Sequence, residues 1–181
     1  MRIESRDDWS RTTALAFAAV ALLVHLLTIN RYGYFRDELY YIACSGHLAF
    51  GYVDLAPLSA LLLRIETVVL GTSLVALRFL PALAHAATIL VTAAIARELG
   101  GRTWAVALAC AASLSALVYL AIGNFYSLNA FEPLFWGSCV YLLVRILNGG
   151  SPRLWLWFGV AAGLGVENKH SVAFFGAGLV L

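Results

Sequence analysis

The 42 residues from Thr103 to Val144 contain a single charged side chain, that of Glu132. At about 1.5 Å per residue they would form roughly 63 Å of helix, twice the roughly 30 Å hydrocarbon core of a bilayer. The segment must therefore cross a membrane and turn back once. We predict the turn at residues 123–129, where Gly, Asn, Ser and aromatic residues occur together.

The composition of the whole chain supports a membrane location. Hydrophobic residues make up 62% and charged residues 12% of the 181 positions, whereas soluble domains average about 45–50% and about 25%. The excess apolar surface has to face lipid. The net charge of +2 is too small to suggest a nucleic-acid partner, and no basic run supports one. The three cysteines are scattered, which predicts small buried residues rather than disulfides.

We therefore predict an all-α, polytopic transmembrane bundle that forms one domain over residues 1–181. The first apolar stretch has no small-residue cleavage site after it, so we expect a retained membrane helix rather than a signal peptide. Because the last apolar run is too short to cross, we expect the N-terminal part of a longer membrane domain. The predicted spans lie at about residues 12–30, 76–96, 103–122, 130–147, 154–167 and 170–181 onward.

The arginines set the predicted orientation. Three groups of them lie before the first span and in two later loops: Arg2, Arg6, Arg11, Arg97, Arg102, Arg145 and Arg153. The positive-inside rule places these three groups in the cytoplasm. This assignment requires that residues 57–71 do not cross the membrane. Their helix of roughly 22 Å, with Arg64 and Glu66 in its middle, favours an interfacial position.

This orientation brings several other ionisable side chains to the outer face. They are Asp37, Glu38, Asp54, Glu132, Glu167, Lys169 and His170. Ionisable groups on one side of a membrane bundle indicate a functional site. The alternative interpretation is that helix ends simply tolerate charge. His25 and His85 lie inside apolar spans, and we expect them to serve packing.

The first outer loop carries a dense group of polar residues. Residues 37–50 are amphipathic at helical spacing, which predicts a helix lying on the membrane surface. Its first turn contains Asp37 and Glu38, which also match the helix dipole. Asp54 precedes Pro57, so it is either the N-cap of the next helix or a third carboxylate of the site.

Carboxylates, cations and aromatic residues at a membrane surface suit group transfer from a lipid-linked sugar. A carboxylate can be a general base toward a hydroxyl or can hold a divalent metal. A cation can neutralise a phosphate leaving group. The sequence contains no phosphate-binding loop, dinucleotide fingerprint or zinc-protease motif that would indicate other chemistry.

Four segments resemble glycosyltransferase family 39, the dolichyl-phosphate-mannose–protein mannosyltransferase-like enzymes that include the bacterial lipid A aminoarabinose transferase. The segments are residues 36–41, 51–58, 124–134 and 163–171. The resemblance implies a GT-C fold and a location in a bacterial plasma membrane. It also implies transfer of a sugar from a polyprenyl-phosphate donor to an acceptor hydroxyl, on a lipid or protein, at the extracytoplasmic face.

The resemblance also implies roles for individual residues. Asp37 would be the catalytic carboxylate, with Glu38 beside it. The expected substrate-binding residues are Arg36, Tyr40, Tyr41, Asp54, Asn124, Tyr126, Asn129, Glu132, Lys169 and His170. No cofactor is assigned; a divalent metal, if one takes part, would have Asp37, Glu38 and Asp54 as candidate ligands.

The chain also departs from the family pattern. Aminoarabinose transferases carry basic residues where this chain has Tyr40 and Leu55, so their phosphate contacts do not carry over. Arg36, Lys169 and His170 are the substitutes we expect.

Two other functions remain open from the sequence. A transporter or flippase would use intramembrane acids such as Glu132 as a proton or substrate path, and it predicts inverted repeats. A non-catalytic membrane scaffold predicts that the carboxylates do not converge.

Overall fold

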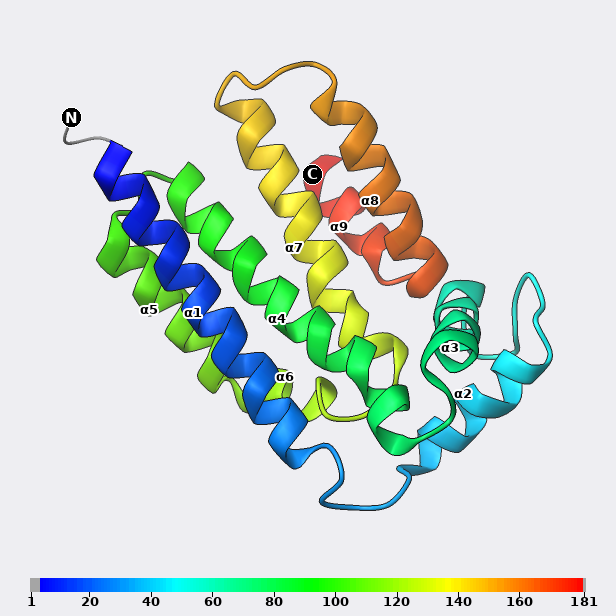
Figure 1. The fold of residues 1–181 in the computed structure, drawn as a ribbon. Coiled ribbons are helices and arrows are strands. Elements are labelled where there is room, and N and C mark those ends of the chain that lie inside the picture. The colour runs from blue at the N-terminus through cyan, green and yellow to red at the C-terminus, as the bar shows by residue number, and fades with distance from the viewer. Residues whose placement is uncertain (1–3, 181) are drawn as a thin grey trace.

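The computed structural model describes residues 4–180, and the regular structure in that range is entirely α-helical. The predicted all-α membrane bundle is confirmed (Figure 1). Arg2 and Leu181 lie outside the described residues, as does the side chain of Arg6. The helices are α1 (Glu4–Thr28), α2 (Arg36–Gly46), α3 (Pro57–Leu70), α4 (Leu74–Glu98), α5 (Thr103–Ser115), α6 (Leu117–Ile122), α7 (Leu128–Leu147), α8 (Leu154–Asn168) and α9 (Val172–Val180).

Three of the described helices are long and apolar enough to cross a bilayer: α1 from Trp9 to Thr28, α4 and α7. Helix α4 lies at the centre of the bundle, where it packs against α1, α5 and α7 (Figure 1). The core between α1 and α4 is rich in small residues, including Ala18, Ala21, Ala86 and Ala93. Small residues allow close helix contact in a membrane. All three cysteines are buried and free, as predicted.

The predicted span at residues 103–122 consists of two helices in the structure. Helix α5 ends at Ser115, Ala116 is extended with φ −65° and ψ 113°, and α6 follows. The change of direction carries the next loop to the end of α1. There the Thr28 hydroxyl lies 3.3 Å from Asn124 Oδ1, and the Tyr32 hydroxyl donates to the Asn124 carbonyl at 2.7 Å.

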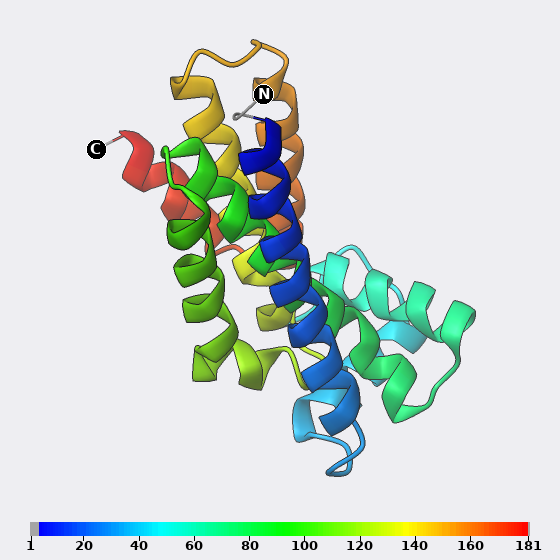
Figure 2. The ribbon, with the colours of Figure 1, turned by 60° about the vertical axis from the view of Figure 1, so that its left-hand side comes forward.

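Helices α2 and α3 lie beside one end of the bundle rather than along it (Figure 2). Their bounds agree with the predicted surface helices, except that α2 ends at Gly46 instead of Phe50. The chain leaves the helix there because Tyr52 folds back onto its end. The Tyr52 hydroxyl lies 3.0 Å from the carbonyl oxygens of Cys44 and His47.

The start of α3 decides one of the alternatives left open for Asp54. Pro57 occupies the first turn of α3, and Ala56 is its N-cap residue. Proline suits this position because the first helical N–H groups have no partner within the helix. Asp54 therefore does not cap α3, and its carboxylate is available for another contact.

Candidate active site

A buried ion pair between Arg78 and Glu38 organises the end of the bundle where α2 begins. Arg78 lies in the second turn of α4, and both side chains are 0% exposed. The guanidinium donates to the two carboxylate oxygens at 2.8 and 2.7 Å. It also donates to the carbonyl oxygens of Ile29 at 2.6 Å and Gly33 at 2.7 Å. Arg78 thereby fixes the connection between α1 and α2.

The sequence predicts a catalytic role for Glu38, but its carboxylate faces protein donors only. Besides its two bonds from Arg78, Glu38 accepts from the backbone N–H of Phe35 at 2.7 Å and of Tyr126 at 3.0 Å. Its side chain has no exposed surface for a substrate or a metal ion. Through these bonds the buried Glu38 carboxylate joins α2 to α4 and to the loop before α7.

Asp37, the neighbour of Glu38, has a different environment. Its side chain is 42% exposed, and Arg36 Nε lies 3.1 Å from Asp37 Oδ1. The Arg36 side chain is itself 91% exposed, so water reaches both groups. An accessible carboxylate on a helix whose neighbouring residue is locked in place can accept a proton from a bound hydroxyl.

Asp54 lies against the same helix. The Tyr40 hydroxyl donates to Asp54 Oδ1 at 2.5 Å. This hydrogen bond to the carboxylate raises the pKa of Tyr40, because it stabilises the neutral phenol. Tyr40 is three residues after Asp37, so both lie on the same side of α2. We call Asp37, Tyr40 and Asp54 the α2 group.

Tyr41 and Tyr126, two of the expected substrate-binding residues, are buried in the core. The Tyr41 hydroxyl accepts from the backbone N–H of Leu128 at 3.1 Å, and the Tyr126 hydroxyl donates to the Ser59 carbonyl at 2.6 Å. Their rings meet edge to face with centroids 5.5 Å apart. Burial raises the pKa of both phenols. These tyrosines connect α2, α3 and the start of α7.

A second polar group joins α7 to the segment between α8 and α9. Lys169 Nζ lies 2.6 Å from Glu132 Oε2 and donates to Asn129 Oδ1 at 2.9 Å. The Ser171 hydroxyl donates to the other Glu132 oxygen. We call Asn129, Glu132, Lys169 and Ser171 the α7 group. It borders a hollow of about 550 Å³ whose walls include Tyr119, Ile122, Asn129, Glu132, Pro133 and Trp136.

The expected site residues thus form two groups joined through buried side chains. The link runs from α2 through Tyr41 to the first residue of α7, and through Glu38 to Tyr126. Asn124 contacts the end of α1. His170 is exposed, beside the α7 group in sequence.

The residues considered as metal ligands do not form a metal site. Among the described residues, no cluster of three or more His, Cys, Asp or Glu side chains has a geometry that could hold a metal ion. Glu38 is occupied by Arg78, and Asp54 by Tyr40.

Sequence reasoning did not assign a role to Arg78 or Glu66. Glu66 lies in α3 and is 3% exposed, and it accepts from the Leu80 backbone N–H at 2.9 Å. Burial raises the pKa of Glu66 to about 8. The signal that could have found both residues is a charged side chain within a strongly apolar segment, which requires a partner or a shifted charge state.

These features define a class: an α-helical membrane protein whose bundle carries polar, partly exposed side chains at one end. The sequence matches the family model for dolichyl-phosphate-mannose-protein mannosyltransferase over residues 54–181. The chain belongs to this family of membrane glycosyltransferases, as its resemblance to glycosyltransferase family 39 predicted. No match was found among curated proteins or solved structures.

The matched range covers the whole of one polar group but only part of the other. It includes Asp54 and the whole α7 group, but it begins after α2. Asp37 and Glu38 lie outside the matched range.

Proposed function

We propose that this chain forms the catalytic end of a glycosyltransferase that moves a sugar from a polyprenyl phosphate to an acceptor hydroxyl, with Asp37 as general base. The observation that carries the proposal is the contrast between two adjacent carboxylates of α2. Glu38 is buried and receives four hydrogen bonds, while Asp37 is partly exposed at the helix start. The fixed residue orients the accessible one.

In the proposed reaction, the acceptor oxygen attacks the anomeric carbon of the donor sugar. The bond from that carbon to the phosphate oxygen breaks, and polyprenyl phosphate leaves with the electron pair. Asp37 takes the proton of the acceptor hydroxyl. A single displacement of this kind inverts the configuration at the anomeric carbon. Asp37 needs only to lie within hydrogen-bond distance of the hydroxyl to fulfil this role.

Two further features are suited to the donor. An apolar hollow of about 380 Å³ lies between the loop after α2, the start of α3 and α8, with Phe50, Leu58, Leu61 and Leu164 in its walls. We assign it to the first isoprene units of the donor. We assign the phosphate to Arg36, Lys169 and His170, and Lys169 would have to exchange its contact with Glu132 for this one.

The test is Asp37→Asn, assayed for sugar transfer from a polyprenyl-phosphate mannose, the kind of donor that the family name describes. Asparagine keeps the size of the side chain but cannot accept the proton. We expect transfer to fall by about 10²–10⁴-fold, while binding of the donor lipid to the purified variant changes little.

Arg64→Gln is the control, because Arg64 is an exposed charged residue of α3 at the same end of the bundle and lies neither in the two polar groups nor in the walls of the apolar hollow. It should transfer sugar at the wild-type rate. Near-normal transfer by Asp37→Asn would end the catalytic assignment. A wild-type protein that binds the donor but transfers no sugar would contradict the proposed enzyme as a whole.

A further inference from the structure

A large cavity lies at the opposite end of the bundle from Asp37. Its volume is about 900 Å³. Its walls come from the start of α1, the end of α4, the start of α5 and the end of α7, which lie at the same end of the bundle in Figure 1. By the arginine distribution this is the cytoplasmic end. The proposed sugar transfer does not use this cavity.

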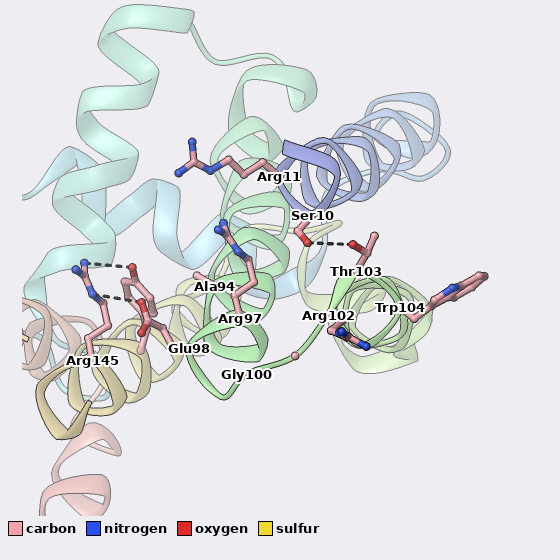
Figure 3. A pocket seen from close by; sticks show the side chains of 12 residues that line it. Ser10, Arg11, Ala94, Arg97, Glu98, Gly100, Arg102, Thr103, Trp104 and Arg145 are labelled. Atoms are coloured by element: carbon pink, nitrogen blue, oxygen red, sulfur yellow. Dashed lines mark hydrogen bonds and ion pairs between the residues drawn. The ribbon is translucent and has the colours of Figure 1, made fainter. Parts of the chain in front are cut away.

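The described lining of the cavity is strongly basic. It contains Arg11, Arg97, Arg102 and Arg145, but only one carboxylate, that of Glu98. Arg145 is held in place, with its Nε 3.4 Å from Glu98 Oε1 and its Nη1 3.4 Å from the Tyr141 hydroxyl. Figure 3 shows Arg11 and Arg97 extending from different helices into the same space, while Arg102 lies beside Thr103 and Trp104.

The turn that carries Arg97 and Arg102 is fixed by two glycines. Gly100 has a φ of +84°, a conformation that favours glycine. The Gly101 N–H donates to the Ala96 carbonyl at 2.8 Å. A Cβ at Gly101 would lie 2.5 Å from that same oxygen. The two arginines are thus presented from a tight connection rather than from a flexible loop.

Exposed aromatic and aliphatic residues place the cavity at the depth of lipid headgroups. Trp9 and Trp104 lie at this end of α1 and α5 and are 69% and 87% exposed. Tryptophan is enriched at the membrane–water interface. Farther along the same helices, Leu15 and Leu108 are also exposed. A molecule with its headgroup in the cavity would find an apolar surface for its acyl chains.

We propose that this cavity binds the phosphate headgroup of an anionic phospholipid. Guanidinium groups match the geometry of phosphate, and basic pockets between membrane helices on the cytoplasmic side bind anionic headgroups. The positive-inside rule explains why arginines occur on this face, including Arg153. It does not explain why four of them, from different helix ends, line one cavity.

The test uses the purified 181-residue chain in detergent with mixtures of dioleoyl phosphatidylglycerol and dioleoyl phosphatidylcholine. Bound lipid is counted by native mass spectrometry. We expect the wild type to prefer phosphatidylglycerol, and Arg11→Gln and Arg102→Gln each to weaken that preference about fivefold. Arg153→Gln removes the same charge from the same face outside the cavity, and it should leave the preference unchanged.

Three results would overturn the proposal. An equal loss in Arg153→Gln would show that only the general charge of this face matters. Displacement of phosphatidylglycerol by millimolar inorganic phosphate would identify free phosphate as the ligand. The sequence also places Asp7 and Asp8 near the start of α1. If their carboxylates neutralise the arginines, the wild type will bind phosphatidylglycerol and phosphatidylcholine equally well, and this is the third result that would overturn the proposal. That last measurement needs no variant, so it stands even where a substitution impairs folding.

Discussion

The carboxylates of Asp37 and Glu38 are neighbours in the sequence and differ completely in environment. Consecutive residues of a helix point about 100° apart, so one faces the protein and the other faces outward. Glu38 points toward Arg78 on α4. This direction leaves Asp37 on the accessible side of α2, 42% exposed.

Glu38→Gln should strongly destabilise the protein. The variant leaves the buried charge of Arg78 without a full partner, a change that costs about 3–5 kcal/mol of unfolding free energy in other buried ion pairs. Thermal unfolding of the purified protein in detergent measures the effect. Asp37→Asn, one residue away and exposed, is the control and should change stability by no more than about 0.5 kcal/mol.

The double variant Glu38→Gln/Arg78→Met provides a second measurement on the same pair. It should lose less stability than the sum of the two single variants, because each single variant leaves a buried polar group unpaired. Additive losses would show that the two side chains contribute independently and that Arg78 does not act through Glu38.

Glu66 should make stability depend on pH. Its pKa in the folded protein is raised to about 8 by burial, from an ordinary value of 4.5. Between these values the unfolded chain releases the proton while the folded protein keeps it. Stability should therefore fall as the pH rises from about 4.5 to about 8, by at most about 1.4 kcal/mol per pH unit.

Glu66→Gln isolates this contribution, because glutamine still accepts from the Leu80 N–H but does not titrate. Unfolding temperatures of both proteins at pH 5 and pH 8.5 are the measurement. The wild type should lose more stability than the variant over this range. Parallel changes in the two proteins would mean that Glu66 is already ionised in the folded state.

At the scale of elements, helix positions followed from local sequence signals. Pro57 marks the start of α3, and the charged and glycine-rich residues after Ala96 mark the end of α4. The existence of a turn within residues 103–144 followed from the length of the segment, and its position from the glycine and polar residues at 123–129. The division of α5 from α6 did not, because Ala116 carries no local signal. The helix that follows leads to a tertiary contact between Asn124 and the end of α1, which is not visible in the sequence.

The candidate site shows the same limit. Residues close together in sequence, such as Asp37 and Tyr40, could be placed on one side of α2 from helical periodicity. The pairing of Arg78 with Glu38 spans 40 positions. Which charged residues on different helices pair with each other depends on how the helices pack. No spacing in a single sequence indicates this pairing.

Gly101 tests the turn between α4 and α5. Gly101→Ala would bring a methyl group within 2.5 Å of the Ala96 carbonyl oxygen, which is backbone and cannot rotate away. We expect a loss of about 1–3 kcal/mol, the usual range for overpacking. Gly33→Ala is the matched control, because nothing lies within 4 Å of its added Cβ. Equal unfolding temperatures for the two variants would contradict the tight turn.

At the scale of the whole molecule, the two ends of the bundle differ in charge and in contacts. One end carries the α2 and α7 groups, and the other carries the arginine-lined cavity. Both proposals depend on which end faces the cytoplasm. The sugar donor and the anionic headgroup would be bound from opposite leaflets, so a reversed orientation would remove the basis of both.

Single-cysteine labelling in intact cells can determine this orientation. In a background where the three native cysteines are replaced, Val53→Cys places a thiol at a fully exposed position between α2 and α3, and Leu99→Cys places one at a 70% exposed position after α4. A membrane-impermeant maleimide should label position 53 from outside, because the loop after α2 lies at the end opposite the three arginine groups assigned to the cytoplasm. It should label position 99 only after the membrane is opened. Labelling of both positions from the same side would refute the arrangement, because α4 could not then separate the two ends of the bundle.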